Sequence, residues 1–78
     1  MRNVINIERI KNDLKKIRTN ILSNELDGAI EISNRIINSF TPEGGVSNSL
    51  KGEIYLNRGI ANARSGKDND AIADYSKA

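Results

Sequence analysis

The sequence contains no cysteine and no histidine among its 78 residues. Without cysteine the chain can form no disulfide framework and no thiolate metal site. Without histidine it lacks the commonest metal ligand and the commonest general base in proteins. Carboxylates are present, but no pattern fixes two of them in one site. We therefore expect no catalytic residue, no metal site and no cofactor, and we do not expect an enzyme.

The sequence also lacks a long apolar run. Its amino terminus, MRNVINIERIKND, carries charge at Arg2, Glu8 and Arg9, which is typical of neither a signal peptide nor a membrane span. We therefore expect a cytoplasmic protein without a membrane partner. Many residues are asparagine, isoleucine or lysine, which is typical of proteins from AT-rich bacterial genomes and favours a bacterial origin.

An excess of one charge is missing as well. The formal net charge is +2 and charged residues make up 28% of the chain, so nucleic acid is not the partner that the composition favours. A chain of this length forms one domain at most. It buries only about 60–65% of the surface that its unfolded chain exposes, so its core is small.

Residues 6–23 predict the first helix, because apolar side chains recur at intervals of three and four. This stripe consists of Ile7, Ile10, Leu14, Ile17 and Ile21. Two heptads are too few for a coiled coil, so the stripe predicts a helix that faces a core. The opposite face carries Lys11, Lys15, Lys16 and Arg18. A basic face of this kind is more often solvated surface than a docking surface for anions.

A second helix is expected over residues 25–40, with Ser23 or Asn24 as its cap. Its apolar face consists of Leu26, Ala29, Ile30, Ser33, Ile36, Ile37 and Phe40. The segment Thr-Pro-Glu-Gly-Gly at 41–45 ends this helix, because proline and glycine both disfavour its continuation. A loop over 41–49 follows.

The last third of the chain predicts two more helices. One starts at a cap among Ser47–Ser49 and runs to about Ser65, and the other starts near Asp68 after a break at Gly66. Gly59 lies inside the third helix, where glycine costs about 1 kcal/mol relative to alanine. We interpret it as a point of close approach for the fourth helix, with Ala71 facing it.

Residues 53–78 resemble one tetratricopeptide repeat (TPR), a pair of antiparallel helices. The resemblance rests on Tyr55, Gly59, Gly66, Ala71, Tyr75 and Ala78, which are packing residues in that family. Two positions depart from it: Arg58 stands where leucine is commoner, and Asn62 where a large apolar residue is usual. A buried amide at Asn62 would need a hydrogen-bond partner.

A comparison of the two halves extends the resemblance. Placing Ala29 over Ala71 gives an offset of 71 − 29 = 42 residues, which also places Asn24 over Gly66. The usual TPR period is about 34 residues, so the 41–49 loop accommodates the difference. The resemblance thus implies an all-α fold, a single TPR-like domain over 1–78. A degenerate hairpin at 6–40 stacks on a repeat at 50–78 that stops before its full length, as in a short solenoid.

The resemblance implies a protein–protein interaction module. A partner peptide or helix would lie in the concave groove that the first helix of each pair lines. The groove positions match Glu53, Leu56, Asn57, Ile60, Ala63 and Arg64 in the third helix and Lys11, Leu14, Lys15 and Arg18 in the first. The incomplete second repeat predicts the N-terminal part of a longer repeat array.

Two alternatives stay open. The apolar edge around Ile72, Tyr75 and Ala78 could pair with another copy of the chain and form a homo-oligomer. The basic face of the first helix, at Lys11, Lys15 and Arg18, could bind an anionic surface or nucleic acid weakly, in a manner that salt suppresses.

Overall fold

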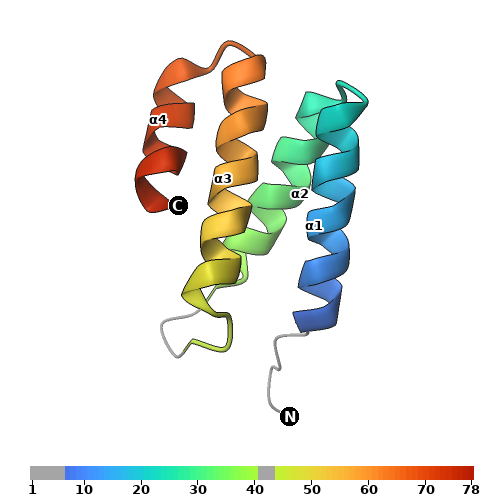
Figure 1. The fold of residues 1–78 in the computed structure, drawn as a ribbon, viewed down its shortest axis with the longest axis vertical. Coiled ribbons are helices and arrows are strands. Elements are labelled where there is room, and N and C mark those ends of the chain that lie inside the picture. Colours follow the sequence, from blue (N-terminus) through green and yellow to red (C-terminus); the bar gives the residue numbers. More distant parts are fainter. Residues whose placement is uncertain (1–6, 41–43) are drawn as a thin grey trace.

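The computed structural model describes residues 7–40 and 44–78, and within these ranges the chain has four α-helices and no strand. The helices are α1 (Ile7–Leu22), α2 (Leu26–Asn38), α3 (Asn48–Arg64) and α4 (Asp68–Lys77). Consecutive helices run in opposite directions and form two antiparallel hairpins (Figure 1). The predicted all-α class and four helices are confirmed. Residue 6 of the expected first helix and residues 41–43 of the expected loop lie outside the described residues.

Each helix packs on the next one along the chain, and α1 also contacts α3. Among the four described helices, α2 and α4 do not pack against each other. The helix α3 is therefore central, because it contacts α1, α2 and α4. The described part of the chain contains no helix that is long and apolar enough to cross a membrane.

The apolar core lies mainly between α1, α2 and α3. Its buried side chains are Ile10, Leu14, Ile17, Ile21, Ala29, Ile36, Val46, Leu50, Ile54 and Ala61. The α1 stripe is thus buried as predicted, with Ile7 half-buried at its start. Burying one such isoleucine or leucine side chain stabilises the fold by roughly 1.5–3 kcal/mol, so this stripe holds α1 on the other two helices.

A Schellman motif joins α3 to α4. The N–H of Gly66 donates to the carbonyl of Ala63 at 3.1 Å, and the N–H of Lys67 donates to the carbonyl of Asn62 at 2.8 Å. Gly66 has a φ of 81°, in the left-handed region that this motif requires and that glycine adopts without strain. The predicted break at Gly66 is therefore the point where the second hairpin reverses.

The turn between α1 and α2 has the same geometry. Asn24, with a φ of 60°, donates its N–H to Ile21 at 3.1 Å, and Glu25 donates to Asn20 at 2.7 Å. Glu25 and Lys67, which precede α2 and α4, both have φ −92° and ψ 68°. The two turns thus match at the 42-residue offset between Asn24 and Gly66 that the sequence comparison gave.

The helix caps agree with the sequence in one hairpin only. The Ser47 side chain accepts the N–H of Leu50 at 3.2 Å, so the predicted cap of α3 is confirmed. The predicted capping of α2 by Ser23 or Asn24 is wrong, because its N-cap is Glu25, which makes no side-chain cap hydrogen bond. Asn24 closes the preceding helix in a left-handed conformation and therefore cannot serve as the extended cap of the next one.

Helices α3 and α4 approach each other closely at Gly59. A Cβ atom there would lie 2.7 Å from Cε1 of Tyr75 and 3.3 Å from Cβ of Asp74. The predicted close contact is present, but the expectation that Ala71 faces Gly59 is wrong. The three atoms nearest to a Cβ at Gly59 belong to Tyr75 and Asp74, because the register between the two helices places these residues opposite Gly59. Ala71 is buried closer to the turn.

The other TPR-like packing residues are less buried than the resemblance implies. Tyr55 is half-buried, and its ring contacts Phe40 edge-on at a centroid distance of 6.3 Å. Tyr75 remains 43% exposed although its ring covers Gly59. Ala78 is exposed and forms the C-cap of α4. The outer side of the second hairpin is therefore only partly covered.

The contact at Gly59 predicts that the effect of Gly59→Ala on stability depends on whether Tyr75 is present. Gly59→Ala should lower the free energy of unfolding by about 1 kcal/mol, because overpacking against Tyr75 exceeds the gain in helix propensity. In a Tyr75→Ala background the same substitution should be neutral or stabilising. Urea unfolding followed by circular dichroism measures both effects. An equal loss in the two backgrounds would show that Tyr75 does not limit the space at Gly59.

Candidate functional site

The residues expected to line a groove lie on the neighbouring helices α1 and α3. The exposed ones are Lys11, Lys15, Arg18, Glu53, Leu56, Ala63 and Arg64. Ile60 is half-buried. We call these eight residues the α1–α3 face. It combines basic side chains from α1 with apolar and charged side chains from α3.

One ion pair joins the two helices on this face. The Nη2 atom of Arg18 lies 3.8 Å from Oε1 of Glu53, and both side chains are about half exposed. An exposed pair of this kind contributes at most about 1 kcal/mol to stability. The pair therefore brings residues from α1 and α3 together while it leaves both side chains accessible to a ligand.

Two residues expected on this face are instead buried. Leu14 belongs to the core, and Asn57 is only 8% exposed. The Nδ2 atom of Asn57 donates to the carbonyl oxygen of Glu53 at 2.7 Å. Asn57 falls at helical spacing between Ile54 and Ala61, on the stripe that α3 turns toward the core. The prediction of Asn57 as an exposed partner contact is therefore wrong.

A cluster of polar side chains lies between α3 and α4 around Asp74, which is only 2% exposed. Arg58 donates to both carboxylate oxygens, from Nη2 to Oδ1 at 2.6 Å and from Nε to Oδ2 at 2.9 Å. Asn62 donates from Nδ2 to Oδ2 at 2.9 Å. This bidentate geometry is the strong form of an arginine–carboxylate pair. The buried amide expected at Asn62 thus has its partner.

Arg58 also connects the second hairpin to the first. Its Nη1 atom donates to Oδ1 of Asn34 on α2 at 2.9 Å. The hydrogen bond to Asp74 raises the pKa of Arg58 above its ordinary value, against a smaller opposing effect of burial. The guanidinium group therefore stays charged and holds side chains from three helices together.

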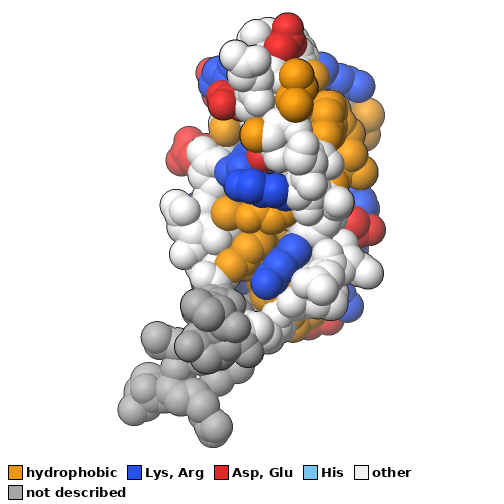
Figure 2. Space-filling model, turned by 90° about the vertical axis from the view of Figure 1, so that its left-hand side faces the viewer, with side chains coloured by type: hydrophobic (Ala, Val, Ile, Leu, Met, Phe, Trp, Pro, Cys, Tyr) orange, Lys and Arg blue, Asp and Glu red, His pale blue; other side chains and the backbone are white. Residues whose placement is uncertain are grey.

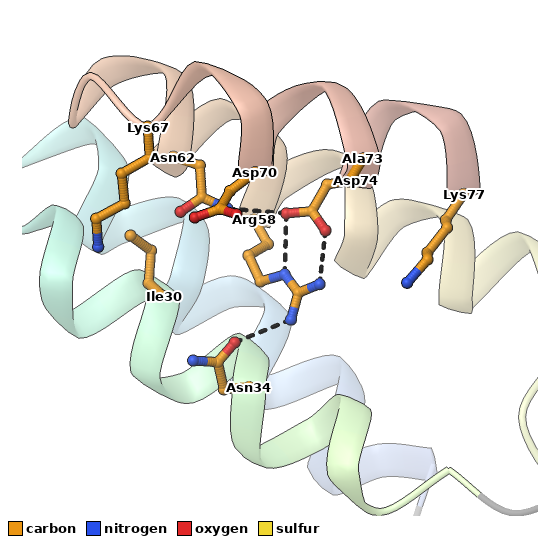
Figure 3. Close-up of a pocket in the computed structure, with 9 residues that line it drawn as sticks. All are labelled: Ile30, Asn34, Arg58, Asn62, Lys67, Asp70, Ala73, Asp74 and Lys77. Carbon is orange, nitrogen blue, oxygen red and sulfur yellow. Dashed lines mark hydrogen bonds and ion pairs between the residues drawn. The ribbon is translucent and has the colours of Figure 1, made fainter.

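The Arg58 cluster forms the floor of an open cleft of about 340 Å³ between α2 and α4. The cleft is lined by Ile30, Asn34, Arg58, Asn62, Lys67, Asp70, Ala73, Asp74 and Lys77. Figure 3 shows Lys67 and Lys77 at opposite ends of the cleft, with Arg58 and Asp74 between them. We call this hollow the α2–α4 cleft.

Aromatic rings with cations above them adjoin the cleft. The Nζ atom of Lys77 lies 5.4 Å from the ring centre of Tyr55, and Cζ of Arg58 lies 5.5 Å from it. Lys51 lies over Phe40 at 5.3 Å. Figure 2 shows basic side chains lying across apolar ones on this side of the molecule. These contacts restrain Lys77 at one end of the cleft.

The sequence contained signals for the Asp74 cluster that the repeat pattern obscured. Asp74 follows Ala71 by three residues, so it falls on the buried stripe of α4. Arg58 and Asn62 are four residues apart on one side of α3, and each replaces an expected apolar residue. A carboxylate on the facing helix is the partner that both require. To predict that these three residues meet, one must know how far α4 is shifted along α3. The sequence did not specify this register between the two helices.

The Asp74 cluster predicts a large and specific loss of stability. Asp74→Asn should lower the free energy of unfolding by about 2–4 kcal/mol, because it leaves the charge of Arg58 partly buried without its counterion. Asp70→Asn is the matched control, since Asp70 is exposed on the same helix and its loss should change stability by less than about 1 kcal/mol. Urea unfolding measures both. Equal stability of Asp74→Asn and the parent chain would contradict this account.

The arrangement offers polar contacts to a ligand. Among the described residues no group of three or more acidic side chains lies close enough to hold a metal ion. A scan against protein-family models finds no matching family, and comparisons with curated proteins and with solved structures find no match.

Proposed function

We propose that the chain is a TPR-like module that binds another protein through a peptide or helix laid on the α1–α3 face. The observation that carries the proposal is the repeated hairpin. Both turns share the Schellman geometry and the same φ and ψ at Glu25 and Lys67. The first helices of the two hairpins also contact each other. Two stacked helix pairs with adjacent first helices are the arrangement from which TPR-type solenoids are built.

The close packing at Gly59 supports the same proposal. The ring of Tyr75 occupies the space that a side chain at this position would need. Ala71 is buried nearer the turn. A close approach of the two helices at a glycine fits the resemblance of residues 53–78, although Tyr75 rather than Ala71 faces this glycine. The proposal places this module in the cytoplasm.

The α1–α3 face offers two kinds of contact to a partner. Lys11, Lys15 and Arg18 supply positive charge along α1, and Leu56 supplies an exposed apolar side chain on α3. A peptide that combines an apolar anchor with carboxylates would match both. Apolar anchors carry most of the affinity at such surfaces, whereas exposed charges mainly select the partner.

The two ends of the helix stack differ in a way that favours a longer array. The 42-residue offset relates each core position of α3 to a position on α1. The α1 residues at these positions are polar and exposed, whereas those of α3 are buried. The pairs are Glu8 with Leu50, Asn12 with Ile54 and Thr19 with Ala61. This side of α1 is not suited to packing against another helix. At the other end, Ile72 is 63% exposed. We propose that a further helix pair covers that end.

A second candidate is self-association through the outer side of the second hairpin. Ile72 and Tyr75 are exposed there, whereas their counterparts in the first hairpin, at the 42-residue offset, are half-buried and buried. The counterparts are Ile30 and Ser33. An isologous pairing of this surface in two copies would bury it without generating an open polymer.

The groove proposal predicts which variants lose a selected peptide. Peptides selected from a random phage-displayed library against residues 1–78 should bind Arg18→Glu and Leu56→Asp variants at least about tenfold more weakly, as expected for contact residues. Arg35→Glu on α2 is the control and should retain binding. Fluorescence anisotropy with the selected peptides gives the affinities. Full binding by both α1–α3 face variants would contradict the groove.

The second candidate predicts a concentration-dependent mass. Light scattering of residues 1–78 should give the mass of two chains at high concentration, and Ile72→Lys should restore the mass of one chain because it places a charge in the apolar contact. Lys16→Gln is the control and should not change the mass. A single-chain mass at every concentration would remove self-association and favour a longer array.

A further inference from the structure

The α2–α4 cleft is a polar hollow that the proposed groove leaves unused. None of the residues of the α1–α3 face lines it. Asp74 at its floor has both oxygens bound by Arg58 and Asn62. The carboxylate of Asp74 therefore cancels the charge of Arg58 and offers little to a ligand. The charges that remain on the walls are those of Lys67, Lys77 and Asp70.

Hydrogen-bond donors outnumber acceptors on these walls. A guanidinium group has five N–H donors, and Arg58 makes three side-chain hydrogen bonds with described residues. The side chains of Lys67 and Asp70 make no hydrogen bond and no ion pair with any residue in the described ranges, and the ammonium group of Lys77 lies over the Tyr55 ring. The amide nitrogen of Asn34 adds a further donor. A ligand with anionic oxygen atoms fits such a surface.

The spacing of the two lysines selects the form of this ligand. Lys67 precedes the first residue of α4 and Lys77 is its last, so their backbones lie about 15 Å apart at the rise of an α-helix. In Figure 3 the two ammonium groups lie at opposite ends of the cleft with Arg58 and Asp74 between them, so in this arrangement a single carboxylate or phosphate group beside one lysine does not meet the other. An extended peptide rises about 3.3 Å per residue and directs alternate side chains to one side, so its residues i and i+4 lie about 13 Å apart on the same side.

We propose that the α2–α4 cleft binds an extended acidic peptide, with carboxylates at positions i and i+4 that pair with Lys67 and Lys77. The peptide backbone crosses the middle of the cleft, where the remaining donors of Arg58 and the amide of Asn34 meet its carbonyl oxygens (Figure 3). Asp70 disfavours a third carboxylate between the other two, because like charges repel. This site is separate from the α1–α3 face and does not rest on the groove proposal.

Two peptides of equal composition and charge test the spacing. Acetyl-Glu-Ala-Ser-Ala-Glu-amide carries its carboxylates at i and i+4, whereas acetyl-Ala-Glu-Glu-Ser-Ala-amide carries them on adjacent residues that point to opposite sides. In nuclear magnetic resonance titrations of the ¹⁵N-labelled chain, the first peptide should shift the amide signals around Lys67, Asp70 and Lys77. It should bind about fivefold more tightly than the second, as two exposed ion pairs allow.

Charge-removing variants test the location. Lys67→Gln with Lys77→Gln should reduce the affinity for the first peptide about fivefold, to that of the second peptide. Lys16→Gln with Arg35→Gln removes the same charge elsewhere and should leave the affinity unchanged. All four side chains are exposed, so the variants should fold, which circular dichroism checks.

Three results would overturn the inference. Equal affinity for the two peptides would mean that the chain attracts them only through their net charge, without pairing each carboxylate with one lysine. Loss of binding in Lys11→Gln with Lys15→Gln, instead of in the cleft variant, would place the peptide on the α1–α3 face and support the groove alone. Inorganic phosphate that shifts the same cleft signals and binds as tightly as the first peptide would make the cleft a site for small anions.

Discussion

The buried carboxylate of Asp74 constrains how the second hairpin can pack. A carboxylate taken out of water is strongly destabilising unless a counterion and hydrogen bonds compensate it. Arg58 and Asn62 supply these along one side of α3, with contacts of 2.6–2.9 Å. Sliding α4 by one turn would separate Asp74 from both partners. Gly59 makes the required approach possible, because its missing side chain leaves room for the ring of Tyr75 and the Cβ atom of Asp74.

The same interaction connects the two hairpins, which are built in different ways. The first hairpin is held by an apolar stripe, with Ile17 fully buried at its centre. The second has few large buried apolar side chains and relies on the Asp74 cluster instead. Because Arg58 also donates to Asn34 on α2, the polar cluster fixes α4 with respect to the first hairpin. The cluster therefore shapes the α2–α4 cleft as well as the contact between α3 and α4.

This division of roles leaves two surfaces with different chemistry. The α1–α3 face is broad, basic along α1 and apolar at Leu56, and its one ion pair between helices is exposed and weak. The α2–α4 cleft rests on a floor of hydrogen-bonded side chains. A ligand on the first surface would meet side chains that can rearrange. A ligand in the cleft would meet the guanidinium group of Arg58, whose position its hydrogen bonds already fix, which lowers the entropy lost on binding at that contact.

The sequence by itself determined the four helices, the break at Gly66, a cap of the third helix among Ser47–Ser49 and the buried stripe from Ile10 to Ile21. Each of these depends on side-chain periodicity or on the backbone preference of residues close together in the chain. Only the tertiary structure decided that Tyr75 rather than Ala71 covers Gly59, that Asn57 is buried, and that Arg58, Asn62 and Asp74 form one cluster. These contacts depend on the register between helices, which joins residues far apart in sequence, and no local preference specifies that register.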